Sequence, residues 1–350
     1  MRAMKSVLLV AVALLIISIV GVSIAAVRIN NFLDMPVLLD DGGASFSIAS
    51  GTSFGGVAAA LQQQGIISNA TMLRFYGRWT GQAERVQAGD YFIASGSSPR
   101  QILDQFTSGD VQLYSFTIIE GWNRWDLLRE LHADPHIDAT MADEDWPALL
   151  QELGAENTHP EGLFLPETYH FPNNTSDRAV LKQAYDLLQK TLAEEWAARS
   201  ESSVIESPYE ALILASIIEK ETARADERQR IAGVFTRRLI KRMRLQTDPT
   251  VIYGIGRDFN GNLTRKDLQT PTPYNTYTRH GLPPTPIAMS GRAAIHAALH
   301  PADGEELYFV ATGNGDGSHK FSVSKEEHDD AVAAYLRQLR SERLQGNKGN

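Results

Sequence analysis

Glu219 is the carboxyl side chain most clearly placed for chemistry, because it closes a long apolar segment. Residues 208–222 predict a helix on which Glu219 shares a face with Ala215 and Ser216. Glu221 points roughly 200° away from that face. Apolar surroundings disfavour a charged carboxyl, so we expect a raised pKa for Glu219, as a general acid at neutral pH requires. The alternative is that Glu219 closes the exposed end of a core helix and pairs with a basic neighbour.

Two further carboxylates, Glu161 and Glu167, lie in the segment 161–171. Apolar and aromatic residues alternate there as in a strand, and Pro166 restricts the segment to a sheet edge or a bend. The two carboxylates could line a cleft. Acids in such positions are more often solvated loop residues, so both interpretations stay open.

Residues 271–286 predict a stiff, irregular loop, because five of these 16 residues are prolines. A loop that is already stiff loses less entropy on binding. It presents the rings of Tyr274 and Tyr277 beside the amide of Asn275. This mixture suits a sugar, whose faces are apolar and whose edges are polar, although it would also suit a peptide groove.

The N-terminal region predicts a membrane anchor. Residues 7–27 carry no charge and are long enough for a helix of roughly 30 Å, which matches the hydrocarbon core of a bilayer. Arg2 and Lys5 precede them, so residues 1–6 are expected in the cytoplasm and the rest of the chain outside it. A signal peptide cleaved near Ala25 is the alternative, although the apolar stretch is longer than such peptides need. We predict a retained anchor, followed by a linker over 28–43.

A short internal repeat follows the linker. Residues 48–53 (IASGTS) recur as residues 93–98 (IASGSS), and residues 118–121 form a looser third copy. Each copy predicts a short strand, a glycine turn and a polar cap before a helix. Such units resemble LysM modules, which bind polymers of N-acetylglucosamine. We therefore expect a LysM-like region over 44–131, with a packing domain that binds no ligand as the alternative.

Composition narrows the class of function. The 350 residues include no cysteine, which excludes a thiol nucleophile, a disulfide framework and cysteine-ligated metal. The net charge of −9 argues against a nucleic-acid partner. The nine histidines show no HExxH spacing, and the glycine run 313–317 predicts a hairpin turn and not a phosphate loop. We expect no metal and no cofactor, and an α+β fold with a small N-terminal module, a larger domain over 132–344 and a polar tail over 345–350.

Five sequence strings make a resemblance specific. In chain order they are EGLFLPETYHF, ASIIEKET, RLQTDPTVIYG, TPYNTYTRHGLPPTPI and LYFVATGNGDGSHKFS. Together with the anchor they resemble the endolytic murein transglycosylase family, also called YceG-like, as far as about Ala333. The resemblance implies a lytic transglycosylase that cuts the MurNAc-β-1,4-GlcNAc bond within nascent peptidoglycan strands, leaves 1,6-anhydro ends and terminates glycan elongation. It makes Glu219, the first glutamate of EKET, the catalytic residue of the domain 132–344.

A single acid suffices for this reaction, because the C6 hydroxyl of the sugar itself attacks C1 and no second carboxylate has to manage water. The candidates for holding N-acetyl and hydroxyl groups are Gln246, Asp248, Tyr274, Asn275 and Tyr277, with Glu161 assisting by orientation or charge. Loop hydrogen bonds and packing are the alternative role for each of them.

The resemblance also implies a location and partners. It predicts a single-pass inner-membrane protein with its catalytic domain in the periplasm. Peptidoglycan strands are the expected substrate and peptidoglycan synthases the expected protein partners. A non-catalytic, peptidoglycan-binding scaffold of the cell envelope is the alternative function.

Overall fold

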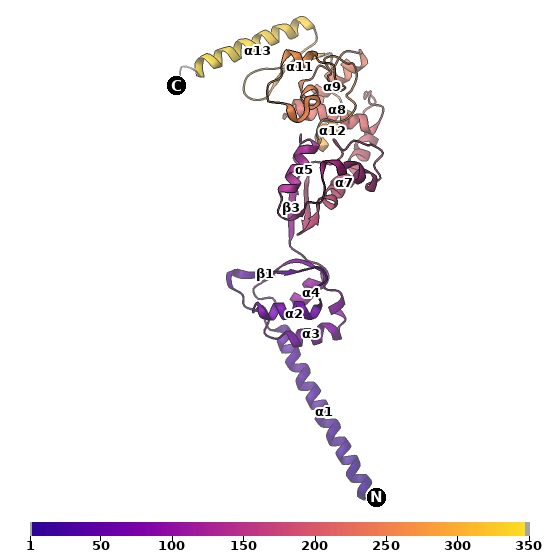
Figure 1. Cartoon of the computed structure of the whole chain (residues 1–350), viewed down its shortest axis with the longest axis vertical. Coiled ribbons are helices and arrows are strands. Elements are labelled where there is room, and N and C mark those ends of the chain that lie inside the picture. The colour runs from indigo at the N-terminus through magenta and orange to yellow at the C-terminus, as the bar shows by residue number, and fades with distance from the viewer. Residues whose placement is uncertain (1, 347–350) are drawn as a thin grey trace. The chain divides into compact units, whose positions relative to one another are not determined.

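The chain forms two compact units that both contain helices and strands (Figure 1). The computed structural model describes residues 2–346, with side chains for 8–40 and 42–340. Unit 1 holds the described residues up to Tyr114 together with His170–Asn174, and unit 2 holds Ser115–Tyr169 and the described residues from Thr175 onward. This mixture confirms the predicted α+β class in its coarse form. The LysM-like and catalytic assignments of 44–131 and 132–344 stay predictions.

The N-terminal helix α1 (Arg2–Asp34) contains a stretch, Leu8–Asp34, that is long and apolar enough to span a membrane. It is the one such helix among the described residues. The helix continues past Val27 into the segment predicted as a linker. Its last turns belong to unit 1, since Phe32 and Leu33 are 8% and 0% exposed within that unit's apolar core.

Unit 1 is a two-stranded antiparallel sheet with three helices. Strand β1 (Gly43–Ile48) pairs with β2 (Gly89–Ala94) in a register that places Phe46 opposite Tyr91. The helices are α2 (Phe54–Gln63), α3 (Ala70–Trp79) and α4 (Pro99–Ser108), and a 3₁₀ turn η1 (Asp40–Gly42) precedes β1 while η2 (Gln82–Glu84) follows α3.

The first two repeat copies have the predicted strand–turn–helix structure. Gly51 and Gly96 lie in the turns with φ of 79° and 94°, a conformation that favours glycine. The hydroxyls of Ser53 and Ser98 then accept hydrogen bonds from backbone N–H groups in the first turns of α2 and α4. The third copy, residues 118–121, lies in unit 2 and not in unit 1.

Unit 2 is mostly helical and contains the segments that carry the candidate site. In this unit β4 runs parallel to β6, and β7 and β8 form an antiparallel hairpin, as the glycine run 313–317 predicted. Strands β3 (Leu113–Thr117) and β5 (Thr168–Pro172) pair with each other, and each has residues in both units. The other elements are α5 (Arg124–Ala133), β4 (Ile137–Asp138), η3 (Asp143–Asp145), α6 (Trp146–Glu152), β6 (Thr175–Ser176), α7 (Asp177–Ala197), α8 (Pro208–Glu221), α9 (Arg228–Ile240), α10 (Asp248–Ile255), η4 (Gly256–Asp258), α11 (Arg265–Gln269), α12 (Arg292–Leu299), β7 (Tyr308–Ala311), β8 (His319–Ser322) and α13 (Lys325–Gly346).

Helix α8 lies at the centre of unit 2. Every residue from Ala211 to Ile218 is buried, so the helix is covered on all sides. It packs against α12, α9, α7 and α10. A helix enclosed in this way gives a rigid support for the side chains at its C-terminal end.

Candidate active site

Glu219 lies in the last turn of α8. Ser207 caps the start of the helix through a hydrogen bond to the N–H of Glu210, and Pro208 occupies the first turn, where a missing N–H costs nothing. The helix ends at Thr222, whose backbone is extended. The Glu219 side chain keeps only 5% of its surface exposed. It is therefore an acid at the edge of an apolar core.

The carboxyl group of Glu219 has two neighbours of positive character. The backbone N–H of Gly291 donates a 3.0 Å hydrogen bond to Oε2, and Nη2 of Arg228 lies 4.0 Å from Oε1. The same Arg228 nitrogen lies 4.0 Å from Oε2 of Glu120. Two glutamates thus share one guanidinium.

Burial raises the pKa of Glu219 above its ordinary value. The Gly291 hydrogen bond and the charges of Arg228 and Lys220 oppose this shift, whereas the negative charge of Glu120 adds to it. The net direction is the one predicted from the sequence. The alternative for Glu219 was an ion pair with a basic neighbour. Arg228 is that neighbour, but its Nη2 lies 4.0 Å from Oε1 of Glu219, at the outer limit for an ion pair.

Two loops hold the surroundings of Glu219 in place. Gly121 N–H donates to the carbonyl of Met289 (2.9 Å), and Met289 N–H donates to the carbonyl of Trp122 (2.6 Å). Ser216, one turn before Glu219, accepts a 2.9 Å hydrogen bond from the N–H of Ile287. The loop that supplies the Gly291 N–H is therefore attached both to α8 and to the segment after β3.

A cleft of about 430 Å³ brings together three of the predicted binding residues, Gln246, Asp248 and Tyr277. The Tyr277 hydroxyl donates a 2.5 Å hydrogen bond to Oδ1 of Asp248. Gln246 is exposed and has a positive φ of 51°. The cleft presents a phenol, a carboxylate and an amide close together, and such groups hydrogen-bond to sugar hydroxyl and N-acetyl groups.

Glu221, for which no role was predicted, also lines this cleft. The hydroxyl of Thr247 donates a hydrogen bond to its Oε1, and burial raises its pKa. Arg238 and His319 line the same cleft. The spacing of Glu219 and Glu221 was visible in the sequence, but the partners of Glu221 come from distant segments that no local pattern connects.

The other two loop candidates, Tyr274 and Asn275, make bonds within the protein. Asn275 is 1% exposed, and its Nδ2 donates to the carbonyls of Asp267, Leu268 and Thr270 at 3.0, 3.1 and 2.7 Å. The Tyr274 hydroxyl lies 2.9 Å from the Thr285 hydroxyl. Asn275 thus attaches its loop to the end of α11, which corresponds to the packing alternative.

Glu161 lies inside unit 2, with no exposed surface. Its carboxylate accepts hydrogen bonds from the N–H of Arg124 at 3.1 and 3.2 Å and from the hydroxyl of Tyr253 at 2.9 Å. Burial raises the pKa of Glu161 to about 7. Glu161 therefore connects the start of α5 to α10, and the aromatic ring of Tyr253 contacts that of Tyr274.

Comparisons with known proteins agree on one family. A model of the YceG-like family matches residues 46–334. The endolytic murein transglycosylase of Bacillus subtilis (strain 168) is 30% identical over 309 residues, which cover 83% of this chain and 84% of that protein. The Streptococcus pneumoniae serotype 2 protein of the same name is 24% identical over 322 residues, and the match spans 58% of its length. The crystal structure of a YceG-like protein from Listeria monocytogenes matches with a TM-score of 0.52 and 30% identity, over 82% of this chain and 98% of that one.

Proposed function

The chain belongs to the YceG-like family, and from this premise we propose that it is an endolytic lytic transglycosylase of peptidoglycan. The bond cut is the MurNAc-β-1,4-GlcNAc bond within nascent glycan strands, and the products carry 1,6-anhydro-MurNAc ends. Cleavage at this point terminates glycan elongation. The observation that carries the proposal is the enclosed carboxyl of Glu219, whose pKa is raised by burial and whose Oε2 accepts the Gly291 N–H.

Glu219 acts first as the acid. Its proton passes to the glycosidic oxygen as the bond from that oxygen to C1 breaks, and the raised pKa keeps this proton available near neutral pH. The carboxylate that remains is stabilised by the Gly291 N–H and by the charge of Arg228. It then takes the proton of the sugar's C6 hydroxyl while that oxygen bonds to C1. No water is consumed, because the attacking group belongs to the substrate.

The cleft beside Glu221 binds a part of the glycan strand other than the bond that is cut, because Glu219 is not among the residues that line it. Gln246, Asp248 and Tyr277 hold hydroxyl and N-acetyl groups there, since all three line it. Asn275, Tyr274 and Glu161 position this machinery from within the protein. Their hydrogen bonds fix the loop 271–286 and the contact between α5 and α10.

Helix α1 anchors the protein in the inner membrane. Its stretch Leu8–Asp34 supports a single span, and Arg2 and Lys5 favour a cytoplasmic N-terminus with both units in the periplasm. Anchoring places the site close to glycan strands as they leave the membrane. Peptidoglycan synthases are the protein partners that this role implies.

The test is to incubate the detergent-solubilised full chain with unsubstituted glycan strands and to determine the masses of the products by mass spectrometry. Fragments that lack one water relative to hydrolysis products are expected. Hydrated ends would instead identify a hydrolase. Intact strands that remain bound to the protein would identify a non-catalytic, peptidoglycan-binding scaffold.

The variant Glu219→Gln should still bind glycan strands but lose cleavage by about 10²–10⁴-fold, the usual contribution of a general acid. Glu201→Gln is the matched control, because Glu201 is an exposed glutamate in the loop before α8. Cleavage by Glu219→Gln at the rate of the control variant would overturn the assignment.

A further inference from the structure

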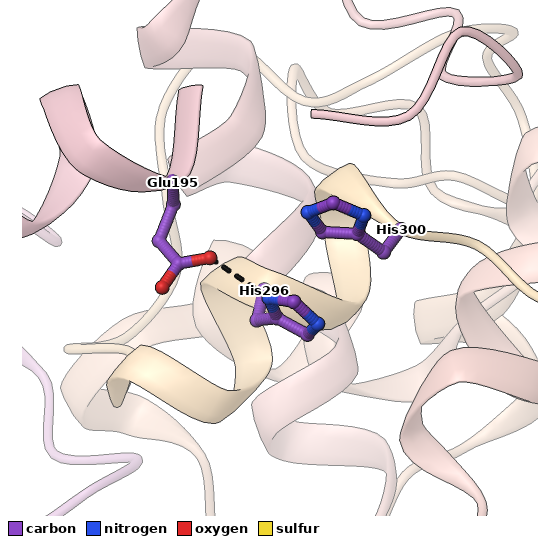
Figure 2. Close-up of side chains that lie close together, drawn as sticks. All are labelled: Glu195, His296 and His300. Atoms are coloured by element: carbon purple, nitrogen blue, oxygen red, sulfur yellow. Dashed lines mark hydrogen bonds and ion pairs between the residues drawn. The ribbon is translucent and has the colours of Figure 1, made fainter. Parts of the chain in front are cut away.

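Three potential metal ligands meet where α7 packs against α12. Glu195 lies near the end of α7, and His296 and His300 lie one helical turn apart at the end of α12. One ligand atom from each of these residues lies within 4.8 Å of the others. Figure 2 shows the three side chains gathered in one place, with the Glu195 carboxylate beside the His296 ring.

We propose that Glu195, His296 and His300 bind a divalent transition metal ion of the zinc type. Two imidazoles and one carboxylate form a donor set that zinc accepts in proteins, and the fourth position remains for water. His296 lies within α12 and His300 follows its last residue, and their ring centroids are 4.1 Å apart. The set is open to solvent on one side, since His296 is exposed whereas Glu195 is buried.

The ligand atoms are close enough for such an ion, but the rings of His296 and His300 are stacked with 23° between their planes, so they must turn for both nitrogens to face it. A tetrahedral zinc with bonds of about 2.0–2.1 Å holds its ligand atoms about 3.3 Å apart. Nδ1 of His296 now lies 2.8 Å from Oε2 of Glu195, a separation that a shared proton explains. A metal ion would replace this proton, and the ring of His300 would close on it.

An ion-pair network without a metal would explain the positions of Glu195 and His296 but not that of His300. Glu195 and His296 have partners without a metal, because Nε of Arg292 also donates to Oε1 of Glu195 at 2.7 Å. Nε2 of His300, in contrast, is buried and has no hydrogen-bond partner among the described residues. A buried polar atom without a partner is costly, and coordination of a metal would satisfy it.

Arg292 is positioned to act as an outer-sphere partner of the metal site, because it hydrogen-bonds to the ligand Glu195. Its hydrogen bond holds one carboxylate oxygen of Glu195 and leaves the other oxygen toward His296. Partners of this kind orient a ligand before the metal arrives. A hollow of about 550 Å³ lined by Glu195, Arg292 and His296 provides the entry path.

The proposal departs from the expectation of no metal, which was drawn from local spacing alone, whereas Glu195 and His296 are 101 residues apart in the chain. The spacing His296–His300 alone is too short a pattern to identify a metal site. Only the packing of α7 on α12 supplies the carboxylate.

The experiment titrates zinc chloride into the full chain in detergent, purified without a histidine tag and treated with a chelator. Calorimetry should give one ion per chain. Cobalt(II) should give the visible absorption of a tetrahedral site. His300→Gln and His296→Gln should each weaken binding by more than the roughly 10–100-fold that loss of an outer-sphere partner causes.

His280→Gln is the matched control, since His280 is exposed and lies outside the cluster. It should bind zinc as the unmodified protein does. Thermal unfolding provides a second measurement: zinc should raise the Tm of the unmodified protein and of His280→Gln, but not that of a folded His300→Gln. Zinc binding of equal strength in His300→Gln and the unmodified protein, or no saturable binding, would overturn the proposal.

Discussion

Glu219 and Gly291 are joined by a hydrogen bond from the Gly291 N–H to Oε2, and the side chain of Glu120 lies directly against Gly291. A Cβ atom built at Gly291 would lie 1.8 Å from Oε1 of Glu120. The φ of Gly291 is −70°, a conformation open to any residue. The one obstacle to a side chain here is therefore Glu120, whose half-exposed side chain can move, and not the backbone.

Replacing Gly291 with alanine should move the Glu120 carboxyl aside, because its atoms are the ones that a Cβ would meet. We expect Gly291→Ala to lower the free energy of unfolding by less than about 1 kcal/mol, because the atoms in its way are the end of a half-exposed side chain that can turn aside. The double variant Gly291→Ala/Glu120→Ala should recover most of this loss, because it removes the atoms that clash. Denaturant titration of both variants and of Glu120→Ala alone gives the coupling energy. Additive effects of the two substitutions would contradict the proposed clash.

The rate of glycan cleavage should fall as the pH rises through the pKa of Glu219, since only the protonated carboxyl can act as the acid. The negative charge of Glu120 contributes to the raised pKa. Glu120→Gln removes this charge, so the pKa of Glu219 should fall and the alkaline limb of the pH–rate profile should move to lower pH. The shift should shrink at high salt, because Glu120 is half exposed and its charge is screened. A limb that stays in place or moves upward would show that Glu120 does not act on Glu219.

Glu161 should make the stability of unit 2 depend on pH. Its pKa is about 7 in the folded protein against 4.5 for a free glutamate, so the folded state holds a proton that the unfolded state loses first. Its contribution is complete below pH 4.5 and declines as the pH rises through about 7. The decline should amount to about 3 kcal/mol. Denaturant titrations followed by tryptophan fluorescence measure it.

Glu161→Gln is the matched variant for this effect, because the amide keeps the size of the side chain and can still bond to Arg124 and Tyr253. Its stability should change less than that of the unmodified protein between pH 4.5 and 7. Parallel pH profiles for the two proteins would contradict the protonation of Glu161.

Local patterns predicted those features of the site that depend on neighbours in the chain. The apolar period of residues 208–222 was sufficient to place Glu219 at the edge of a core helix, and its pKa is raised as predicted. The hairpin around residues 313–317 followed from its glycine turn. The repeated strand–turn–helix structure of unit 1 followed from its glycines and serine caps.

Contacts between distant segments could not be predicted in this way. The partner of Glu219, Gly291, lies 72 residues later, and Thr247, the partner of Glu221, lies 26 residues later. The end of α1 was also missed. The helix continues past Val27 to Asp34, and Phe32 and Leu33 in its last turns pack into the core of unit 1. Helix length was thus decided by tertiary packing and not by the apolar run.

Asn275 and Tyr277 show why a polar loop could not be divided into binding and structural residues from its composition. Both side chains have the chemistry for a sugar, yet Asn275 donates to three carbonyls at the end of α11, whereas Tyr277 donates to an exposed aspartate in the cleft. Asn275→Ala removes a partner from three backbone groups at once. It should lower the free energy of unfolding by about 1–3 kcal/mol.

Tyr277→Phe is the matched comparison, since it keeps the ring and removes only the hydroxyl from the cleft. We expect it to change stability by less than about 1 kcal/mol, because water can replace the lost bond at the exposed Asp248. It should instead raise the KM for glycan strands by about 2–10-fold, the equivalent of one neutral hydrogen bond, with a smaller change in kcat. Denaturant titration and steady-state kinetics on both variants separate the two roles. A Tyr277→Phe protein with lowered stability and unchanged KM would place Tyr277 with Asn275 among the residues that only support the loop.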